Sequence, residues 1–126
     1  MSATMTTRVV FVVDSDLSVR ESLTLLVQAA GWHAETFASA REFLACRRPV
    51  VPSCLILDVG LPGMSGPDLQ EELIRRGSAI PIVFITAQGD KSLRPLLIGR
   101  GAVACLFKPF SDNAVLDALD AALGPR

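Results

Sequence analysis

The sequence predicts an α/β fold in which helices cover both faces of a doubly wound, parallel sheet of five strands. Five short runs of aliphatic or β-branched residues recur along the chain, and four of them are close to continuously apolar, as strands buried on both faces should be. Segments with helical hydrophobic spacing lie between these runs. Strands that alternate with helices form parallel βαβ units, so the two observations together favour this fold.

The predicted strands are these five apolar runs. They are expected at Val9–Val13, His33–Phe37, Leu55–Leu57, Ile82–Ile85 and Ala104–Phe107. The His33–Phe37 run mixes polar and apolar residues and therefore suits an edge of the sheet. His33, the single histidine of the chain, is accordingly expected to be an ordinary strand residue.

Capping and stop signals mark the first three predicted helices. The Ser18–Glu21 segment has the spacing of a capping box before a helical stripe, and Gly31 is placed to end that helix. The Ser39–Glu42 segment has the same spacing before the second helix. Pro67 is expected in the first turn of a third helix. Its apolar side is marked by Leu69, Leu73 and Ile74.

Pro95 decides where the fourth helix can begin. In the interior of a helix starting near Asp90 it would remove a backbone donor and clash with the preceding turn, so we expect either a late start or a kink. The consecutive residues Leu96–Ile98 cannot all face one core, so at least one should be exposed. Ser111 or Asp112 is expected to cap the last helix.

Chemically useful side chains follow four of the predicted strands. Asp14 and Asp16 come after the first strand, Asp58 after the third, Thr86 after the fourth and Lys108 after the fifth. Ligands of open α/β sheets bind at the carboxyl ends of the strands, so these residues should share one edge. Gathered carboxylates favour a hard cation such as Mg²⁺. A carboxylate can also attack phosphorus to form an aspartyl-phosphate, whose oxygens a hydroxyl and a lysine can neutralise.

Composition excludes several other kinds of site. The 126-residue chain has 12 Lys+Arg against 13 Asp+Glu, and this formal net charge of -1 is unlike the basic balance of a nucleic-acid-binding domain. Its three cysteines, Cys46, Cys54 and Cys105, have no CxxC spacing and indicate neither a disulfide framework nor a zinc site. One histidine is too few for a multi-histidine metal site, and a His-based triad is not expected because His33 is interpreted as an ordinary strand residue.

The length and the apolar runs predict one soluble, cytoplasmic domain over residues 1–126. The longest clean apolar run has five residues, whereas a membrane span needs roughly 20, so no membrane partner is expected. We expect a disordered leader over residues 1–7 and a tail or linker start over residues 124–126, which favours a fragment of a longer protein.

The motifs at the strand ends carry a family resemblance. They read Val-Val-Asp14, Leu-Asp58-Val-Gly-Leu-Pro-Gly-Met-Ser-Gly66, Ile-Thr86-Ala and Lys108-Pro109-Phe110. Over nearly its whole length the chain resembles the receiver domains of response regulators in two-component signalling, in particular those with a helix-turn-helix DNA-binding output domain. The resemblance implies a flavodoxin-like sheet with strand order 2-1-3-4-5. It also implies a regulatory phosphoacceptor and not a metabolic enzyme.

The resemblance assigns roles to individual residues. Asp58 would be the phosphoacceptor, Thr86 the switch hydroxyl and Lys108 the phosphate-pairing lysine, with a cis peptide bond before Pro109. Mg²⁺ would be held by Asp14, Asp58 and the backbone carbonyl of Gly60.

Partners follow from the same resemblance. The expected phosphodonor is a sensor histidine kinase, and the output surface lies on the fourth helix, fifth strand and fifth helix, where a homodimer could form. An effector domain, and any direct binding to nucleic acid, would lie outside this chain.

Two positions depart from the family pattern. Ser15 stands where the family usually has a second acid that contacts the metal, so Mg²⁺ affinity should fall. Asp16 is either a substitute ligand or a helix cap. Cys105 stands where the family often has a switching aromatic residue. Two hypotheses therefore stay open: a phosphorylation-operated switch, and a degenerate receiver that acts as a phosphorylation-independent interaction module.

Overall fold

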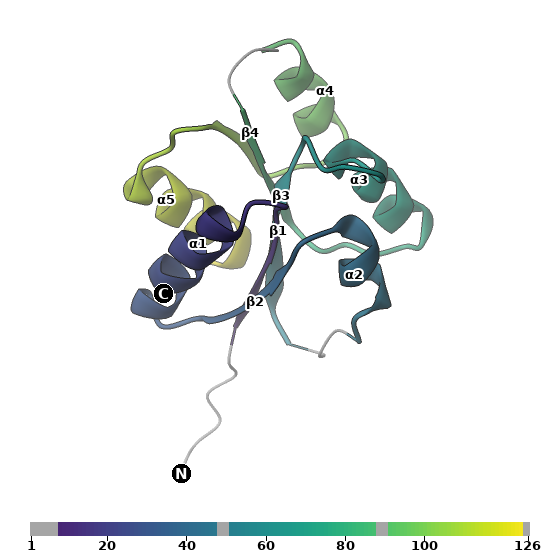
Figure 1. Cartoon of the computed structure of the whole chain (residues 1–126). Coiled ribbons are helices and arrows are strands. Elements are labelled where there is room, and N and C mark those ends of the chain that lie inside the picture. The colour runs from purple at the N-terminus through teal and green to yellow at the C-terminus, as the bar shows by residue number, and fades with distance from the viewer. Residues whose placement is uncertain (1–7, 48–50, 88–90, 125–126) are drawn as a thin grey trace.

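The computed structural model, which describes residues 8–47, 51–87 and 91–124, places one parallel sheet between two layers of helices (Figure 1). The strand order is β2-β1-β3-β4-β5, and every paired strand is parallel to its neighbour. The strands are β1 (Val9–Val13), β2 (His33–Phe37), β3 (Ser53–Asp58), β4 (Ile82–Thr86) and β5 (Ala104–Phe107). This confirms the predicted sheet and its order, although β3 extends beyond the predicted run at both ends and β4 extends by one residue to include Thr86.

Five helices cover the two faces of the sheet. They are α1 (Leu17–Ala29), α2 (Ala40–Ala45), α3 (Gly66–Arg75), α4 (Leu93–Gly99) and α5 (Asp112–Leu123). Helices α1 and α5 lie on one face, and α2, α3 and α4 lie on the other (Figure 1). None of the helices in the described part of the chain is long and apolar enough to cross a membrane.

Alternate residues of the central strands supply two separate cores. In β1, for example, Phe11 and Val13 face α2 and α3, while Val10 and Val12 face α1 and α5. All five residues of β1 are buried, because helices cover both sides of this strand. Each fully buried large aliphatic or aromatic side chain stabilises the fold by about 1.5–3 kcal/mol relative to exposure. This burial explains why the inner strands read as continuously apolar.

Most of the predicted helix ends are confirmed. The Ser39 hydroxyl accepts a hydrogen bond from the Glu42 amide at 3.2 Å, and the Ser111 hydroxyl accepts one from the Ala114 amide at 3.0 Å. Gly31 follows α1 with a φ of 92°, a conformation that favours glycine.

The predicted cap of α1 at Ser18 is wrong. Helix α1 begins at Leu17, and its N-cap is Asp16. The Asp16 carboxylate accepts hydrogen bonds from the Ser18 amide at 2.9 Å and from the Ser18 hydroxyl at 2.7 Å. An aspartate so close to the strand end satisfies the orphan amides of the first turn before Ser18 can do so.

The predicted apolar side of α3 is wrong at one position. Leu69 and Leu73 are buried, but Ile74 is 53% exposed, and Gln70 is buried in its place. Successive residues turn by about 100° around a helix, so Ile74 points well to the side of the face that Leu69, Gln70 and Leu73 share.

Pro95 lies in the first turn of α4, as one of the two alternatives predicted. Leu97 is fully buried, whereas Leu96 and Ile98 are 48% and 37% exposed, which confirms that the three cannot share one core. The Lys108–Pro109 peptide bond is cis. The expectations for residues 1–7, for the tail after Gly124 and for a helix start near Asp90 lie outside the described residues.

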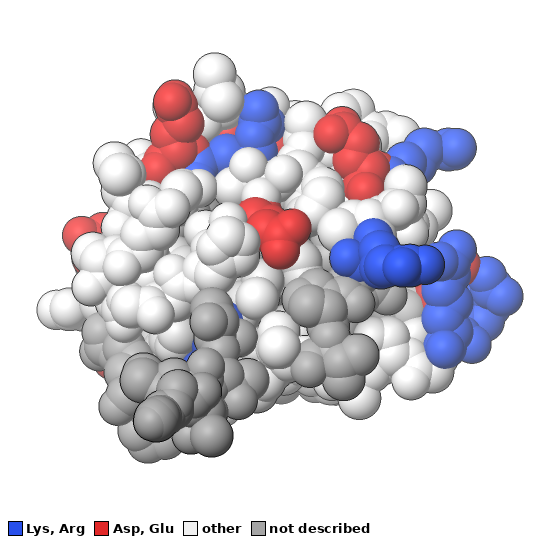
Figure 2. All heavy atoms as spheres, turned by 90° about the horizontal axis from the view of Figure 1, so that it is seen from below, with Lys and Arg blue, Asp and Glu red and all other residues white. Residues whose placement is uncertain are grey.

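The small net charge is unevenly distributed over the surface. In the view from below, basic side chains gather at one side of the face, and acidic side chains are scattered (Figure 2). At the C-terminal end of α3, basic charge is locally compensated, since both Arg75 and Arg76 pair with Glu72 of this helix.

Candidate functional site

The parallel sheet brings three of the predicted site residues into contact at one edge. The Lys108 ammonium donates a hydrogen bond to Asp14 Oδ2 at 3.0 Å and lies 3.5 Å from Asp58 Oδ1. Asp14 directly follows β1 and Asp58 ends the neighbouring strand β3, and Lys108 reaches both from beyond β5 across the end of β4. One cation therefore bridges two carboxylates that lie far apart in the sequence.

Asp14 is buried and is held from three sides. Its Oδ1 accepts a hydrogen bond from the Asp16 amide at 2.8 Å, and its Oδ2 accepts the bond from Lys108. Its backbone carbonyl accepts a hydrogen bond from the Arg20 guanidinium at 2.7 Å. These bonds fix the Asp14 carboxylate, so Asp14 positions the Lys108 ammonium beside Asp58.

Asp58 carries less well compensated charge. Burial, followed by the charge of Asp14, raises the pKa of the Asp58 carboxyl, against the opposing effects of Lys108 and of a hydrogen bond from the Gly60 backbone. Burial alone would lower the pKa of Lys108, but its hydrogen bond to Asp14 and the charge of Asp58 outweigh burial and raise it. Lys108 therefore keeps its positive charge, and additional positive charge nearby would stabilise the Asp58 carboxylate.

Thr86 stands at the same edge without contacting the carboxylates. It is the last residue of β4, directly next to β3 in the sheet, and it is half-buried. Its hydroxyl donates to the carbonyl of Ala87 at 3.2 Å, and the described structure records no hydrogen bond from it to Asp58 or Lys108. A rotation about its side chain would free this hydroxyl for another acceptor.

The acidic residue of the loop after β1 is engaged by the first turn of α1. Ser15 is exposed, and Asp16 is exposed with its carboxylate already bonded to Ser18. Hydrogen bonds from the Ser18 side chain and amide lower the pKa of Asp16. The structure thus supports the capping role of Asp16, while its role as a metal ligand stays a prediction.

The carboxylate oxygens of Asp14 and Asp58 could supply some, but not all, of the ligands of a small hard cation. No group of three or more His, Cys, Asp or Glu residues in the described ranges is arranged to hold a metal ion. Asp14 and Asp58 nevertheless converge on one ammonium, and burial together with the charge of Asp14 raises the pKa of Asp58, so a cation near it would stabilise its charged form. Mg²⁺ commonly binds through one or two carboxylates and retains several waters, so these residues fit such an ion without a complete protein cage.

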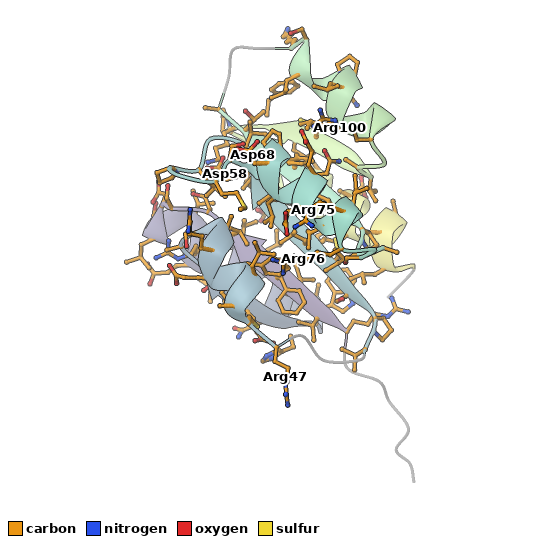
Figure 3. All side chains as sticks on the ribbon, turned by 90° about the vertical axis from the view of Figure 1, so that its right-hand side faces the viewer. Arg47, Asp58, Asp68, Arg75, Arg76 and Arg100 are labelled. Atoms are coloured by element: carbon orange, nitrogen blue, oxygen red, sulfur yellow. The ribbon has the colours of Figure 1, made fainter. Side chains whose placement is uncertain are left out.

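Sequence reasoning does not assign a role to two residues around the site. Arg20 bonds to Asp14 from a position six residues along, a spacing that carries no recognised signal. At Gly66, a Cβ atom would lie 2.4 Å from the Asp58 carbonyl oxygen, so only glycine fits there. Gly66 belongs to the motif after β3, and its place in that motif is the sequence signal by which it could have been found. Figure 3 shows Asp58 beside the N-terminal end of α3, with Arg75 and Arg76 near the other end of this helix.

Comparison with known proteins places the chain in a sequence family. Residues 10–120 match the family model of the response regulator receiver domain. Nodulation protein W of Bradyrhizobium diazoefficiens is 50% identical over 117 residues, which cover 93% of this chain and 52% of that protein. The transcriptional regulatory protein TdiR of Thauera aromatica is 40% identical over 114 residues, which cover 90% of this chain and 50% of that protein. The chain spans about half the length of the curated relatives it matches.

Solved structures agree with the sequence match. The response regulator StyR superposes with a TM-score of 0.87 at 49% identity, over 93% of this chain and 59% of that one. The crystal structure of FixJ-N superposes with a TM-score of 0.84 at 32% identity, over 94% of both chains. With the matched family model and the strand order 2-1-3-4-5, these similarities show that the chain belongs to the response regulator receiver domains, which are signalling domains.

Proposed function

We propose that this chain is a cytoplasmic phosphoacceptor module that receives a phosphoryl group on Asp58 from a sensor histidine kinase and thereby switches a protein-contact surface. The observation that carries the proposal is the Lys108 ammonium held between Asp14 and Asp58 at the carboxyl edge of the sheet. It provides a nucleophilic carboxylate and a fixed positive charge at the place where phosphoryl oxygens would arrive.

The residues of the site have distinct parts in this transfer. A carboxylate oxygen of Asp58 attacks phosphorus, the bond from phosphorus to the donor nitrogen breaks, and the donor imidazole keeps the electron pair. Lys108 pairs with a phosphoryl oxygen, and Asp14 keeps the ammonium in position. Thr86 turns its hydroxyl from the Ala87 carbonyl to a phosphoryl oxygen, so it senses the new charge. Mg²⁺, when bound through Asp14, Asp58 and the Gly60 carbonyl, supplies further positive charge to those oxygens.

The proposed output surface includes α4 and β5. Leu96 and Ile98 of α4 and Val103 just before β5 are exposed apolar residues. Such side chains suit contact with a second copy of the chain or with another protein domain. Effector functions, including any DNA binding, are proposed to lie outside the 126 residues, since the matched relatives are about twice as long.

Phosphorylation by a small donor tests the proposal directly. The chain is incubated with acetyl phosphate and Mg²⁺, and intact mass spectrometry follows the addition of one phosphoryl group. We expect the wild-type chain and the matched control Asp117→Asn, an exposed aspartate of α5, to gain this mass. Asp58→Asn should gain none. A mass gain that persists in Asp58→Asn would overturn the assignment of the acceptor.

A second candidate is a phosphorylation-independent interaction module. It is favoured by exposed, neutral Ser15 and by the absence of a three-acid metal cluster among the residues placed in the structure. The variant Ser15→Asp separates the two candidates, because an added carboxylate should tighten Mg²⁺ binding and speed phosphorylation if the proposed register is right. If neither the wild-type chain nor Ser15→Asp is phosphorylated at millimolar Mg²⁺, the second candidate is the better account.

A further inference from the structure

Helix α3 begins in direct contact with the acidic site. The Gly66 amide donates to the Val59 carbonyl at 3.1 Å, immediately after Asp58. The close approach of Gly66 to the Asp58 carbonyl leaves no room for a side chain between the helix and the strand end. A displacement of the backbone at Asp58 must therefore displace the first turn of α3.

One turn further along, Gln70 connects α3 to α4. Its side chain is 1% exposed, and its Nε2 donates to the backbone carbonyl of Leu97 at 3.3 Å. Its Oε1 has no hydrogen-bond partner among the described residues. A buried amide with an unmade hydrogen bond is less favourable for stability than an apolar side chain of the same shape. Stability alone therefore does not account for glutamine at this position.

A second contact between the same helices lies beside Gln70. Glu71 forms an ion pair with Arg100 at 3.1 Å, and Arg100 is the C-cap residue of α4. The Leu97 carbonyl that Gln70 binds also accepts the amides of Arg100 and Ala102, at 3.2 and 3.1 Å. Two successive residues of α3 thus hold the C-terminal end of α4.

The N-terminal end of α4 is the end that follows Thr86 along the chain. Helix α4 has only seven residues, with Pro95 in its first turn, and it carries the exposed Leu96 and Ile98. A short helix held at its C-terminal end moves by rotation about that end, so displacement is largest at its N-terminal turn. This turn is also closest in sequence to the switch hydroxyl.

We propose that Gln70 is a positioning residue that holds the C-terminal end of α4 on α3, so that α4 pivots about Leu97–Arg100 when Asp58 is phosphorylated. The contacts run from Asp58 through Gly66 and Gln70 to α4, and none of them needs an aromatic side chain at position 105. The trigger of this movement rests on the proposed function. The hold on α4 in the unphosphorylated chain does not.

Amide hydrogen exchange measured by NMR tests the hold in the unphosphorylated protein. The variant Gln70→Met removes the hydrogen bond and nearly keeps the side-chain volume, so it should fold. We expect the amides of Arg100, Gly101 and Ala102 to exchange about tenfold faster, as loss of one hydrogen bond implies, while the amides of β1 and β3 keep their rates. The matched control is Glu72→Gln, which alters pairs with Arg75 and Arg76, whereas no hydrogen bond or ion pair joins Glu72 to α4 among the described residues.

Two results of this measurement would overturn the hold. One is an unchanged exchange rate at residues 100–102 in Gln70→Met and in the double variant Gln70→Met with Glu71→Gln. The other is faster exchange throughout the sheet, which would mean that Gln70 supports only global stability. A change confined to the end of α4, and absent from Glu72→Gln, supports the proposal.

The pivot is tested with beryllofluoride and Mg²⁺ as the probe for the phosphorylated state. In the wild-type chain, we expect chemical-shift changes over Leu93–Leu96 and little change over Leu97–Ala102. In Gln70→Met, the changes should extend through Ala102. The same pattern in both proteins would overturn the pivot. If the wild-type chain shows no response to the probe, the proposed function fails, and the hold is still judged by the exchange rates.

Discussion

At Gly66, a hydrogen atom in place of a side chain allows α3 to start against the backbone of Asp58. The glycine is required here by close packing, since its φ is not in the left-handed region. Arg20 and Asp16 have a related effect on the other side of the site, where both bond to Asp14. Residues that are not expected to react thus determine where the reactive carboxylate and ammonium lie.

Gly66→Ala tests this packing. Its Cβ would lie 2.4 Å from the Asp58 carbonyl oxygen, so α3 or β3 must shift. We expect the free energy of unfolding to fall by about 1–3 kcal/mol, as for an overpacked site, and phosphorylation of Asp58 by acetyl phosphate to slow. Denaturant titration and intact mass measure the two effects. The matched control is Gly99→Ala in α4, where a Cβ meets nothing within 4 Å and should stabilise the helix slightly. Equal stabilities of the two variants would contradict the prediction.

The charge of Asp58 gives a prediction about pH. Because burial and Asp14 raise the pKa of Asp58 above its ordinary value of 3.8, the folded chain keeps this proton where the unfolded chain releases it. The contribution of Asp58 to stability is therefore lost as the pH rises from 3.8 through the raised pKa. We expect Asp58→Asn to raise the Tm at neutral pH in Mg²⁺-free buffer, and this gain to vanish below pH 3.8.

Thermal melts across that pH range measure the effect. The control is Asp117→Asn, which replaces an exposed aspartate of α5 by the same chemical change. An increase in Tm that is equal for Asp58→Asn at low and at neutral pH would show that lost charge is not the cause.

At the scale of the elements, several helices depend on polar contacts at their ends. Helix α1 depends on Asp16, helix α3 on the reciprocal capping box of Ser65 and Asp68, and α4 on side chains from α3. In α1 and α3 the cap lies directly beside the acidic edge. The capping groups next to the site therefore also fix the starts of α1 and α3, the helices that begin beside it.

Two variants distinguish the two roles proposed for Asp16, helix cap and metal ligand. Asp16→Ala removes the cap of α1 and should lower the free energy of unfolding by about 0.5–2 kcal/mol. Asp16→Asn keeps a good capping side chain but removes the charge, so it should preserve stability. If Asp16 acts only as a cap, Asp16→Asn also leaves the Mg²⁺ dependence of phosphorylation unchanged. A large loss of Mg²⁺ affinity in Asp16→Asn would instead show that Asp16 is a ligand.

At the scale of the whole molecule, the central strands are shielded by helices on both faces. Cys54 of β3 is fully buried, and burial raises the pKa of its thiol to about 12. Burial also raises the pKa of Cys105, whereas Cys46 lies half-buried at the end of α2. The three thiols therefore report on different parts of the fold.

Alkylation with iodoacetamide uses this difference. The thiolate is the reactive form, so Cys46 should react first in native buffer, and Cys54 should react only when the sheet unfolds globally. Peptide mass spectrometry over a time course, with and without denaturant, measures each site. Reaction of Cys54 at the rate of Cys46 in native buffer would contradict a cooperative core around β3.

Much of the fold could be predicted because its signals are local. Continuous apolar runs identify buried parallel strands, and alternation with helices determines their parallel arrangement. The mixed composition of His33–Phe37 predicts its edge position, and Pro95 predicts either a late start or a kink of α4, of which the structure has the late start. The error at Ser18 arises because Asp16 and Ser18 are both good capping residues. The error at Ile74 arises because the buried residue beside Leu69 and Leu73 is the polar Gln70, which the apolar pattern does not reveal.

By itself, the sequence determined the order of elements and the edge at which Asp14, Asp58, Thr86 and Lys108 gather, because parallel strands all end on one side. Only the tertiary structure decided that Lys108 spans both aspartates, while the hydroxyl of Thr86 bonds to its own neighbour. The tertiary structure alone also decided that Gln70 is buried against α4. The physical reason is that strand ends are set by chain direction, whereas side-chain partners depend on reach, burial and the angle at which helices pack.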